Sequence, residues 1–376
     1  MLELLKIKTR ILTFLDYYFA IAHNAAMKTQ TTQWLLYCRP GFEAECAQET
    51  QAQQLEATPD SGFVRVQGKP RLDFAQLVFA RQLIAVHGTI DNLPQRDRLT
   101  PLLQAIADMA DAPEKFGALW LETPDTNDGK TLSGFTRRFQ PLLEAALSAA
   151  GRLVDDPKLP RLHLFFADQN RAIIGISHPH NSAPWPMGIL RQKMPHDAPS
   201  RSYLKLAEAL ALFLNVDEQK KWLTPGMTAV DLGAAPGGWT WQLVQRGLKV
   251  TAIDNGPMKG AAENHPAIKH LRQDGFRYRP TRPVDWLVCD MVEQPARVAA
   301  LMADWVASGM TKHALFNLKL PMKKRIAALN KALNEIRAVL DAKGARYQLT
   351  AKHLYHDREE VTVFLTRAII RISQPK

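Results

Sequence analysis

The apolar positions follow two different patterns along this chain. From residue 201 onward, short apolar runs of strand length alternate with amphipathic runs of helix length. Such alternation is typical of a parallel sheet with helices on both faces, so we predict a doubly wound α/β domain over residues 201–376. The predicted strands are 228–232, 249–253, 268–271, 284–289, 313–318, 345–353 and 360–366, and the predicted helices are 201–214, 239–246, 296–306 and 322–341. Because the last two strands are nearly adjacent in sequence, we expect one of them to be antiparallel.

Residues 29–178 lack this regular alternation and predict an α+β region in two parts, 29–95 and 96–178. In the second part Asp97 is a predicted helix cap, and two apolar runs flank Asp168 as a hairpin, a pattern that suits a ferredoxin-like layer. The predicted strands are 33–38, 62–66, 83–89, 118–121, 162–166 and 172–177, and the predicted helices are 42–54, 73–81, 99–110 and 131–150. The proline-rich residues 179–200 are a predicted linker.

Residues 1–28 superficially resemble a secretory signal, because basic residues precede an apolar run. Asp16 interrupts that run, which is too short to span a bilayer. We therefore predict an appended extension, with the true start at Met1 or Met27, and expect no membrane-spanning segment elsewhere. The three cysteines are scattered without metal-ligand spacing, so we expect a reduced, cytoplasmic protein without a structural metal.

The charge of the chain is strongly positive. Its 48 Lys and Arg residues exceed its 37 Asp and Glu residues by 11, and the isoelectric point is about 9.5. Such a balance favours a polyanionic partner such as nucleic acid, although an enzyme that is merely basic fits it equally well.

Residues 229–239, Ala-Val-Asp-Leu-Gly-Ala-Ala-Pro-Gly-Gly-Trp, join a predicted strand to a predicted helix through a glycine-rich turn. The turn is neither a G-x-G-x-x-G dinucleotide fingerprint nor a P-loop. It resembles the S-adenosyl-L-methionine loop of FtsJ-type ribose 2′-O-methyltransferases; the alternative is a plain strand-to-helix turn. Ligands in such sheets bind beyond the carboxyl ends of the strands, where acidic residues can contact a ribose or an adenine. The predicted cofactor residues are Ser202, Gly233, Ala235, Pro236, Gly237, Gly238, Trp239, Asp254, Asp274 and Asp290.

Four charged residues match the Lys-Asp-Lys-Glu tetrad of FtsJ-type enzymes in motif and order. They are Lys205 in S-R-S-Y-L-K, Asp290 in C-D-M, Lys319 in N-L-K and Glu360 in R-E-E-V. Glu359 is a rival for the last position, and we prefer Glu360 because it directly precedes a predicted strand. The alternative is that each is only a solvated charge at a strand end.

The resemblance implies a reaction in which Lys319 orients a ribose hydroxyl and, when neutral, accepts its proton as general base. Lys205, Asp290 and Glu360 would hold the Lys319 side chain in position. Base amino methyltransferases usually carry N/D-P-P-Y where this chain has Asp-Met-Val-Glu, and Cys289 is expected to be buried in its strand rather than nucleophilic. Methylation of a base amino group is therefore disfavoured, and so is cytosine C5 methylation, which needs a nucleophilic cysteine.

The combination of Cys38-Arg39-Pro40-Gly41-Phe42-Glu43, a THUMP-like RNA-binding region over 96–178 and the FtsJ-like domain resembles the RlmM family of bacterial 23S rRNA ribose methyltransferases, over about residues 33–376. The resemblance implies 2′-O-methylation of one cytidine in 23S rRNA, on naked RNA or an immature large subunit. We expect a monomer, and residues 1–28 depart from the family pattern. The predicted RNA contacts are Arg191, Lys193, Arg201, Lys323, Lys324 and Arg325.

Two other functions remain open from the sequence. One is an RNA-binding ribosome maturation factor whose methyltransferase domain is inactive, and the intact tetrad disfavours it. The other is a small-molecule methyltransferase, which the basic charge and the large N-terminal region disfavour.

Overall fold

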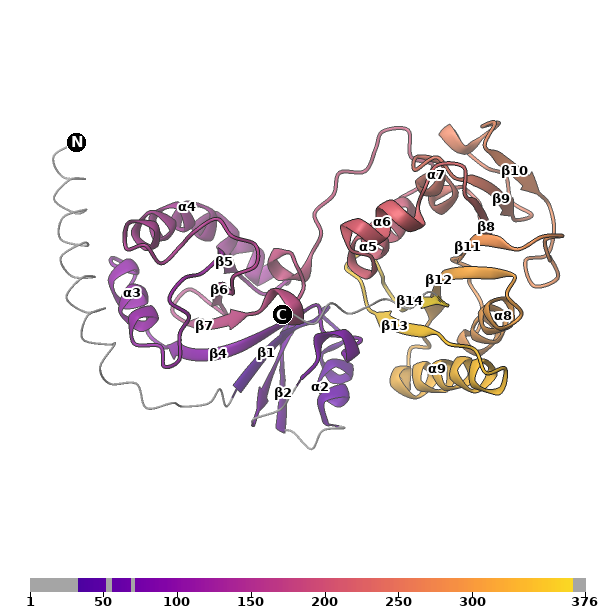
Figure 1. The fold of residues 1–376 in the computed structure, drawn as a ribbon. Coiled ribbons are helices and arrows are strands. Elements are labelled where there is room, and N and C mark those ends of the chain that lie inside the picture. The colour runs from indigo at the N-terminus through magenta and orange to yellow at the C-terminus, as the bar shows by residue number, and fades with distance from the viewer. Residues whose placement is uncertain (1–32, 52–55, 69–71, 368–376) are drawn as a thin grey trace. The chain divides into compact units, whose positions relative to one another are not determined.

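The computed structural model describes residues 33–51, 56–68 and 72–367, so the predicted extension 1–28 and the alternative start at Met27 lie outside the described residues (Figure 1). The chain divides into two compact units between Ile189 and Leu190. This division falls within the segment 179–200 that the sequence predicts as a linker.

The N-terminal unit is built on one seven-stranded sheet in the order β2-β3-β1-β4-β7-β6-β5. Strand β4 pairs antiparallel with both β1 and β7, so the predicted parts 29–95 and 96–178 contribute to the same sheet. The strands are β1 (Gln33–Tyr37), β2 (Glu56–Asp60), β3 (Phe63–Gln67), β4 (Gln82–Ile90), β5 (Ala118–Glu122), β6 (Arg161–Phe166) and β7 (Ala172–Ser177), and the helices are α2 (Glu43–Gln51), α3 (Leu99–Ala107) and α4 (Asn127–Ala149).

The side chain of Asp97 accepts a hydrogen bond from the backbone N–H of Thr100 at 3.1 Å, which confirms its predicted capping role. The predicted helix 73–81 is wrong, because only a single 3₁₀ turn, η1 (Phe74–Gln76), forms there. The carboxylate of Glu49 accepts hydrogen bonds from the backbone N–H groups at 78, 79 and 80, at 2.6 to 3.2 Å. Those donors are therefore satisfied outside a helix.

The C-terminal unit contains a second seven-stranded sheet in the order β10-β9-β8-β11-β12-β14-β13. Strand β14 is antiparallel to both of its neighbours, and the other described pairs are parallel, as the sequence predicted. The strands are β8 (Thr228–Leu232), β9 (Lys249–Ile253), β10 (Ile268–Leu271), β11 (Val284–Cys289), β12 (Thr311–Lys319), β13 (Gln348–Lys352) and β14 (Glu360–Thr366).

Helices cover both faces of this sheet (Figure 1). Helices α5 (Ser202–Phe213), α6 (Val216–Trp222) and α7 (Gly238–Val244) lie on one face, and α8 (Pro295–Ala307) and α9 (Arg325–Ala342) lie together on the other. Apolar side chains of α5 to α7 pack with Trp286 of β11 and Leu315 of β12 in one buried cluster. This packing fixes the strand ends at which the charged residues lie.

The antiparallel direction of β14 decides which of its residues reaches the candidate site. The other strands of the sheet that lead to the site deliver residues at their carboxyl ends, whereas β14 delivers its first residue there. Glu360, the first residue of β14, stands directly opposite Lys319, the last residue of β12. Two residues that are 41 positions apart are thereby brought side by side.

Candidate active site

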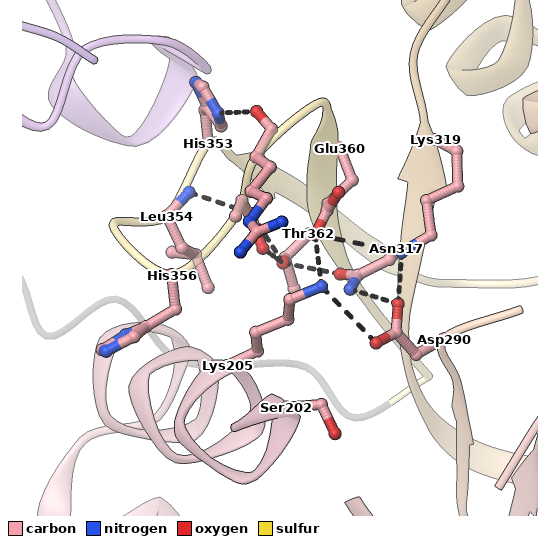
Figure 2. A network of polar contacts seen from close by, with 12 residues as sticks. Ser202, Lys205, Asp290, Asn317, Lys319, His353, Leu354, His356, Glu360 and Thr362 are labelled. Carbon is pink, nitrogen blue, oxygen red and sulfur yellow. Dashed lines mark hydrogen bonds and ion pairs between the residues drawn. The ribbon is translucent and has the colours of Figure 1, made fainter. Parts of the chain in front are cut away.

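Four charged side chains meet at the carboxyl edge of the C-terminal sheet: Lys205, Asp290, Lys319 and Glu360, which we call the charged tetrad (Figure 2). Asp290 lies between the two lysines, with its Oδ1 atom 2.5 Å from Lys319 Nζ and its Oδ2 atom 3.5 Å from Lys205 Nζ. Glu360 Oε1 pairs with Lys205 and lies 3.9 Å from Lys319 Nζ. The tetrad predicted from the sequence is therefore brought together, with two positive and two negative groups.

The lysines retain access to solvent while Glu360 is more deeply placed. The exposed fractions of the side chains are 20% for Lys319, 17% for Lys205 and 8% for Glu360. Burial by itself lowers the pKa of Lys205, but the charges of Asp290 and Glu360 outweigh that effect and raise it above 10.5. Lys205 is therefore a fixed cation at neutral pH. Of the two lysines, it is the one suited to positioning rather than to accepting a proton.

A buried chain of hydrogen bonds connects Asp290 to β12 and β14. The Asn317 amide Nδ2 donates to Asp290 Oδ1 at 2.8 Å, and the Thr362 hydroxyl donates to Asn317 Oδ1 at 2.7 Å. Thr362 Oγ1 also lies 2.9 Å from Asp357 Oδ2. Since the hydroxyl has one hydrogen, Thr362 shares it between Asn317 and the Asp357 carboxylate, whose Oδ2 also accepts a hydrogen bond from the backbone N–H of Leu354 at 3.0 Å. Burial, followed by the charge of Glu360, raises the pKa of Asp357 well above 3.8.

A further buried carboxylate fixes helix α5, which carries Lys205. Glu208 accepts hydrogen bonds from the backbone N–H groups of Tyr355 and His356, at 2.8 and 3.0 Å, and lies 2.6 Å from His356 Nδ1. These contacts join α5 to the segment that leads into β14. They hold Lys205 and Glu360, which come from opposite ends of the unit's sequence, in one place.

The glycine-rich turn between β8 and α7 passes close to the start of α5. Gly237 has a φ of +112°, a conformation that residues with a Cβ rarely adopt. A Cβ added to Gly238 would meet the hydroxyls of Ser200 and Ser202 and lie 2.9 Å from the backbone N of Tyr203. Ser202 therefore packs against the turn, and only glycine at 238 allows that approach.

Beside this turn lies a cavity of about 490 Å³ at the carboxyl ends of β8, β9, β10 and β11. Asp254 forms one wall, and its carboxylate accepts hydrogen bonds from the backbone N–H groups of Ala235 and Gly256, at 3.0 and 2.7 Å. Five of the residues predicted to bind a cofactor line the cavity: Gly233, Ala235, Asp254, Asp274 and Asp290.

The other five predicted cofactor residues do not line this cavity. Pro236, Gly237 and Gly238 shape the turn, and Ser202 packs on it. Trp239 is 2% exposed, and its ring belongs to the core cluster of α5 to α7. At these five positions the motif residues form the turn and its packing, and they do not form the wall of the cavity.

Matches to known proteins cover both units. A relative from Laribacter hongkongensis, "Ribosomal RNA large subunit methyltransferase M", is 56% identical over 345 residues, which is 89% of this chain and 96% of that protein. A relative of the same name from Methylococcus capsulatus is 50% identical over 355 residues, 90% of this chain and 99% of that protein. The chain belongs to the ribosomal RNA large subunit methyltransferase M family. The resemblance seen in the sequence is confirmed.

Three family models divide the chain along these lines. The N-terminal model of ribosomal RNA large subunit methyltransferase M matches residues 97–178, and the RlmM ferredoxin-like domain matches residues 31–70. The FtsJ-like methyltransferase model matches residues 198–347, so it contains the glycine-rich turn, the cavity and three members of the charged tetrad. The predicted fold class, a methyltransferase domain preceded by a ferredoxin-like region, is confirmed.

The basic residues that the sequence predicts as RNA contacts have different surroundings in this family member. Arg191, Lys193, Arg201, Lys323 and Lys324 are exposed. Helix α9 begins at Arg325 rather than at residue 322 as predicted, so Lys323 and Lys324 precede the helix and do not form its first turn. The Arg325 guanidinium lies 2.8 Å from Glu359 Oε2, and its side chain is 14% exposed. Glu359, the rival for the tetrad position, therefore pairs with Arg325 instead of with a tetrad lysine.

Several features bear on other chemistries. Cys289 is fully buried, as predicted, and burial raises the pKa of its thiol to about 12, so it is not a thiolate nucleophile at neutral pH. Over the described ranges, no group of three or more His, Cys, Asp or Glu side chains has an arrangement that could hold a metal ion. No described helix is both long and apolar enough to cross a membrane.

Proposed function

We propose that this chain transfers the methyl group of S-adenosyl-L-methionine to the 2′-hydroxyl of a cytidine ribose in 23S rRNA, with Lys319 as general base. The observation that carries the proposal is the position of Lys319. Its Nζ atom is 2.5 Å from Asp290, and Asp290 also lines the 490 Å³ cavity. A hydroxyl beside Lys319 would therefore lie next to a methyl donor held in that cavity.

The residues of the cavity suit S-adenosyl-L-methionine in charge and shape. Asp254, Asp274, Asp290 and Glu293 line it, and no lysine or arginine among the residues that the structure describes does. A sulfonium and an ammonium group are favoured by such a lining. Asp254 follows β9, the position from which a carboxylate can accept hydrogen bonds from a ribose diol in sheets of this kind. When bound, the cofactor supplies an electrophilic methyl group.

The tetrad residues would align the ribose 2′-hydroxyl, and Lys319 would accept its proton. Asp290 and Glu360 balance the charges of the two lysines, and Lys205 remains protonated because its pKa is raised. Lys319 in its neutral form accepts the hydroxyl proton at Nζ. Alignment accounts for most of the acceleration in a direct displacement, and proton transfer contributes about 10²- to 10⁴-fold.

The relatives named "Ribosomal RNA large subunit methyltransferase M" support large-subunit rRNA as the substrate, as does the net charge of +11. Exposed Arg191, Lys193, Arg201, Lys323 and Lys324 would contact the phosphates, whereas Arg325 is held by Glu359. We further propose that the acceptor is naked RNA or an immature large subunit, in which a single nucleotide can be splayed out of its stack.

The test is methyl transfer from labelled S-adenosyl-L-methionine to rRNA from cells that lack the enzyme, followed by nuclease digestion and mass identification of nucleosides. The comparison is between the native protein, Lys319→Ala and Lys312→Ala, which removes an exposed lysine from the same strand. We expect 2′-O-methylcytidine with the native protein and Lys312→Ala, and its loss with Lys319→Ala. Label on a base would overturn the assignment of the tetrad. Cofactor binding without any transfer would favour a maturation factor with an inactive domain.

A further inference from the structure

A second cavity, of about 400 Å³, opens on the side of Lys319 toward helix α9. Its walls come from the loop between β11 and α8, from the segment that follows β12 and from the first turns of α9. Its charged lining residues are Glu293, Lys319 and Lys331, and Val292, Leu320, Pro321 and Ala328 contribute apolar surface. We call this cavity the α9 cleft.

The α9 cleft adjoins the proposed active site. Val292 and Glu293 line both the cleft and the 490 Å³ cavity, and Lys319 lines the cleft while its Nζ atom contacts Asp290. A group bound in the cleft would therefore lie close enough to Lys319 to belong to the same nucleotide as a ribose placed there. The cofactor cavity and the cleft are separated by the short loop that follows Asp290.

Two apolar side chains at this place are unusually exposed. Val292 is 92% exposed and Met322, next to Pro321, is 75% exposed, the highest values for large apolar side chains in the part of the chain that the structure describes. Exposed apolar side chains beside a hollow often mark a binding site. In RNA recognition, apolar and aromatic groups replace the stacking neighbours of a base that has left its helix.

We propose that the α9 cleft receives the base of the acceptor nucleotide, so that the attached ribose lies at Lys319. This inference rests on the proposed function and adds the place where the RNA substrate is read. Val292, which lines the cleft, contacts a face of the unstacked base, and exposed Met322 follows the lining residue Pro321. Lys331 stands three residues after Ala328 and therefore on the same side of α9. It carries only hydrogen-bond donors, which match the carbonyl oxygen and ring nitrogen of a cytosine.

The test fills the cleft without touching the tetrad. Ala328→Leu adds bulk to a lining residue, and Ala327→Leu adds the same bulk to an exposed neighbour on α9 that does not line the cleft. With an RNA fragment that the native protein methylates, we expect Ala328→Leu to raise the KM for RNA about tenfold or more. We expect its dissociation constant for S-adenosyl-L-methionine and its melting temperature to match those of Ala327→Leu.

A second substrate shows whether a base occupies the cleft. The same RNA fragment is made with an abasic residue at the methylated position, which keeps the ribose 2′-hydroxyl. We expect the penalty of Ala328→Leu to shrink toward unity on this RNA, because the group that clashes is gone. An undiminished penalty, or identical KM values for Ala328→Leu and Ala327→Leu on intact RNA, would overturn the inference while the proposed function stands. Absence of transfer by the native protein to any RNA would overturn both.

Discussion

Asn317 donates its side-chain amide to the same oxygen of Asp290, Oδ1, that contacts Lys319, with N–O distances of 2.8 and 2.5 Å (Figure 2). Asn317 is fully buried, so it does not contact a substrate. It fixes the orientation of the carboxylate that in turn fixes the proposed general base. Asn317 is therefore a positioning residue, and Thr362 behind it extends the same function.

This arrangement predicts a specific effect of Thr362→Val. The variant keeps the shape of the side chain but removes the hydroxyl that holds Asn317, so Asp290 and Lys319 lose their alignment. We expect kcat to fall about tenfold or more, because small misplacements near the reacting atoms are costly, with the KM for S-adenosyl-L-methionine within about threefold. Steady-state kinetics with labelled cofactor would measure both.

Thr366→Val is the matched control. It also removes a buried hydroxyl that bridges β12 and β14, the 2.8 Å contact between Thr366 Oγ1 and His313 Nδ1, but at the far end of the strands. Both variants should lose about 1 kcal/mol of stability or somewhat more. Equal losses of kcat in the two variants would mean that Thr362 has only a structural role.

The neighbouring glutamates Glu359 and Glu360 give a second prediction. Glu360→Gln removes the charge that pairs with Lys205 and helps to raise its pKa, so the tetrad gains a net positive charge and loses its order. We expect kcat to fall about 100-fold. Glu359→Gln affects an ion pair with Arg325 whose carboxylate is 46% exposed, and activity should stay within about threefold. A larger loss from Glu359→Gln than from Glu360→Gln would reverse the assignment, and parallel turnover assays would show it.

Much of the C-terminal unit could be predicted because its strands are short apolar runs whose ends are visible in the sequence. Apolar runs that stop at a charged residue located Asp290 and Lys319, and the predicted bounds of β9, β10 and β11 agree with the structure. The short helix α6 was missed, although Asn215 and Glu218 form a capping box that the sequence displays. These capping residues mark the start of α6 in the sequence itself.

The hydrogen-bond chain behind the tetrad could not be predicted. Asn317 and Thr362 sit inside apolar strands, where a polar residue has no evident partner until the register between β12 and β14 is known. That register places them directly opposite each other. For the same reason the contact of Glu49 with residues 78–80, which replaces the predicted helix 73–81, depends on tertiary packing and not on local pattern.

The packing of Gly238 against α5 leads to a third prediction. Gly238→Ala places a methyl group against the backbone of Tyr203 and the hydroxyls of Ser200 and Ser202, so the turn and the helix must move apart. We expect a loss of about 1–3 kcal/mol in stability and weaker binding of S-adenosyl-L-methionine, measured by urea unfolding and calorimetric titration. Gly134→Ala in α4 is the control, because an added Cβ there meets no described atom within 4 Å apart from its chain neighbours and the backbone of its own helix. It should stabilise the protein by about 0.5–1 kcal/mol. Equal effects of the two substitutions would contradict the account of the turn.

Asp231 in β8 provides a prediction about pH. Its side chain is fully buried, Oδ2 accepts a 2.6 Å hydrogen bond from Thr240, and Oδ1 has no partner within the described ranges. Burial raises its pKa from 3.8 to about 7 despite the hydrogen bond from Thr240. The folded state therefore binds a proton that the unfolded state has lost, and Asp231 makes the protein less stable as the pH rises from about 4 to about 7.

Asp231→Asn keeps the shape of the side chain and removes this titration. The rise of the pKa of Asp231 from 3.8 to about 7 corresponds to about 4 kcal/mol. The free energy of unfolding of the variant, relative to that of the native protein, should therefore rise between pH 4.5 and pH 7 by up to that amount and level off above pH 7. Urea-unfolding curves of both proteins at intervals of half a pH unit would measure the difference. If the two curves of stability against pH run parallel, Asp231 is ionised in the folded protein throughout this range, and its buried charge is balanced by a contact other than the Thr240 hydroxyl.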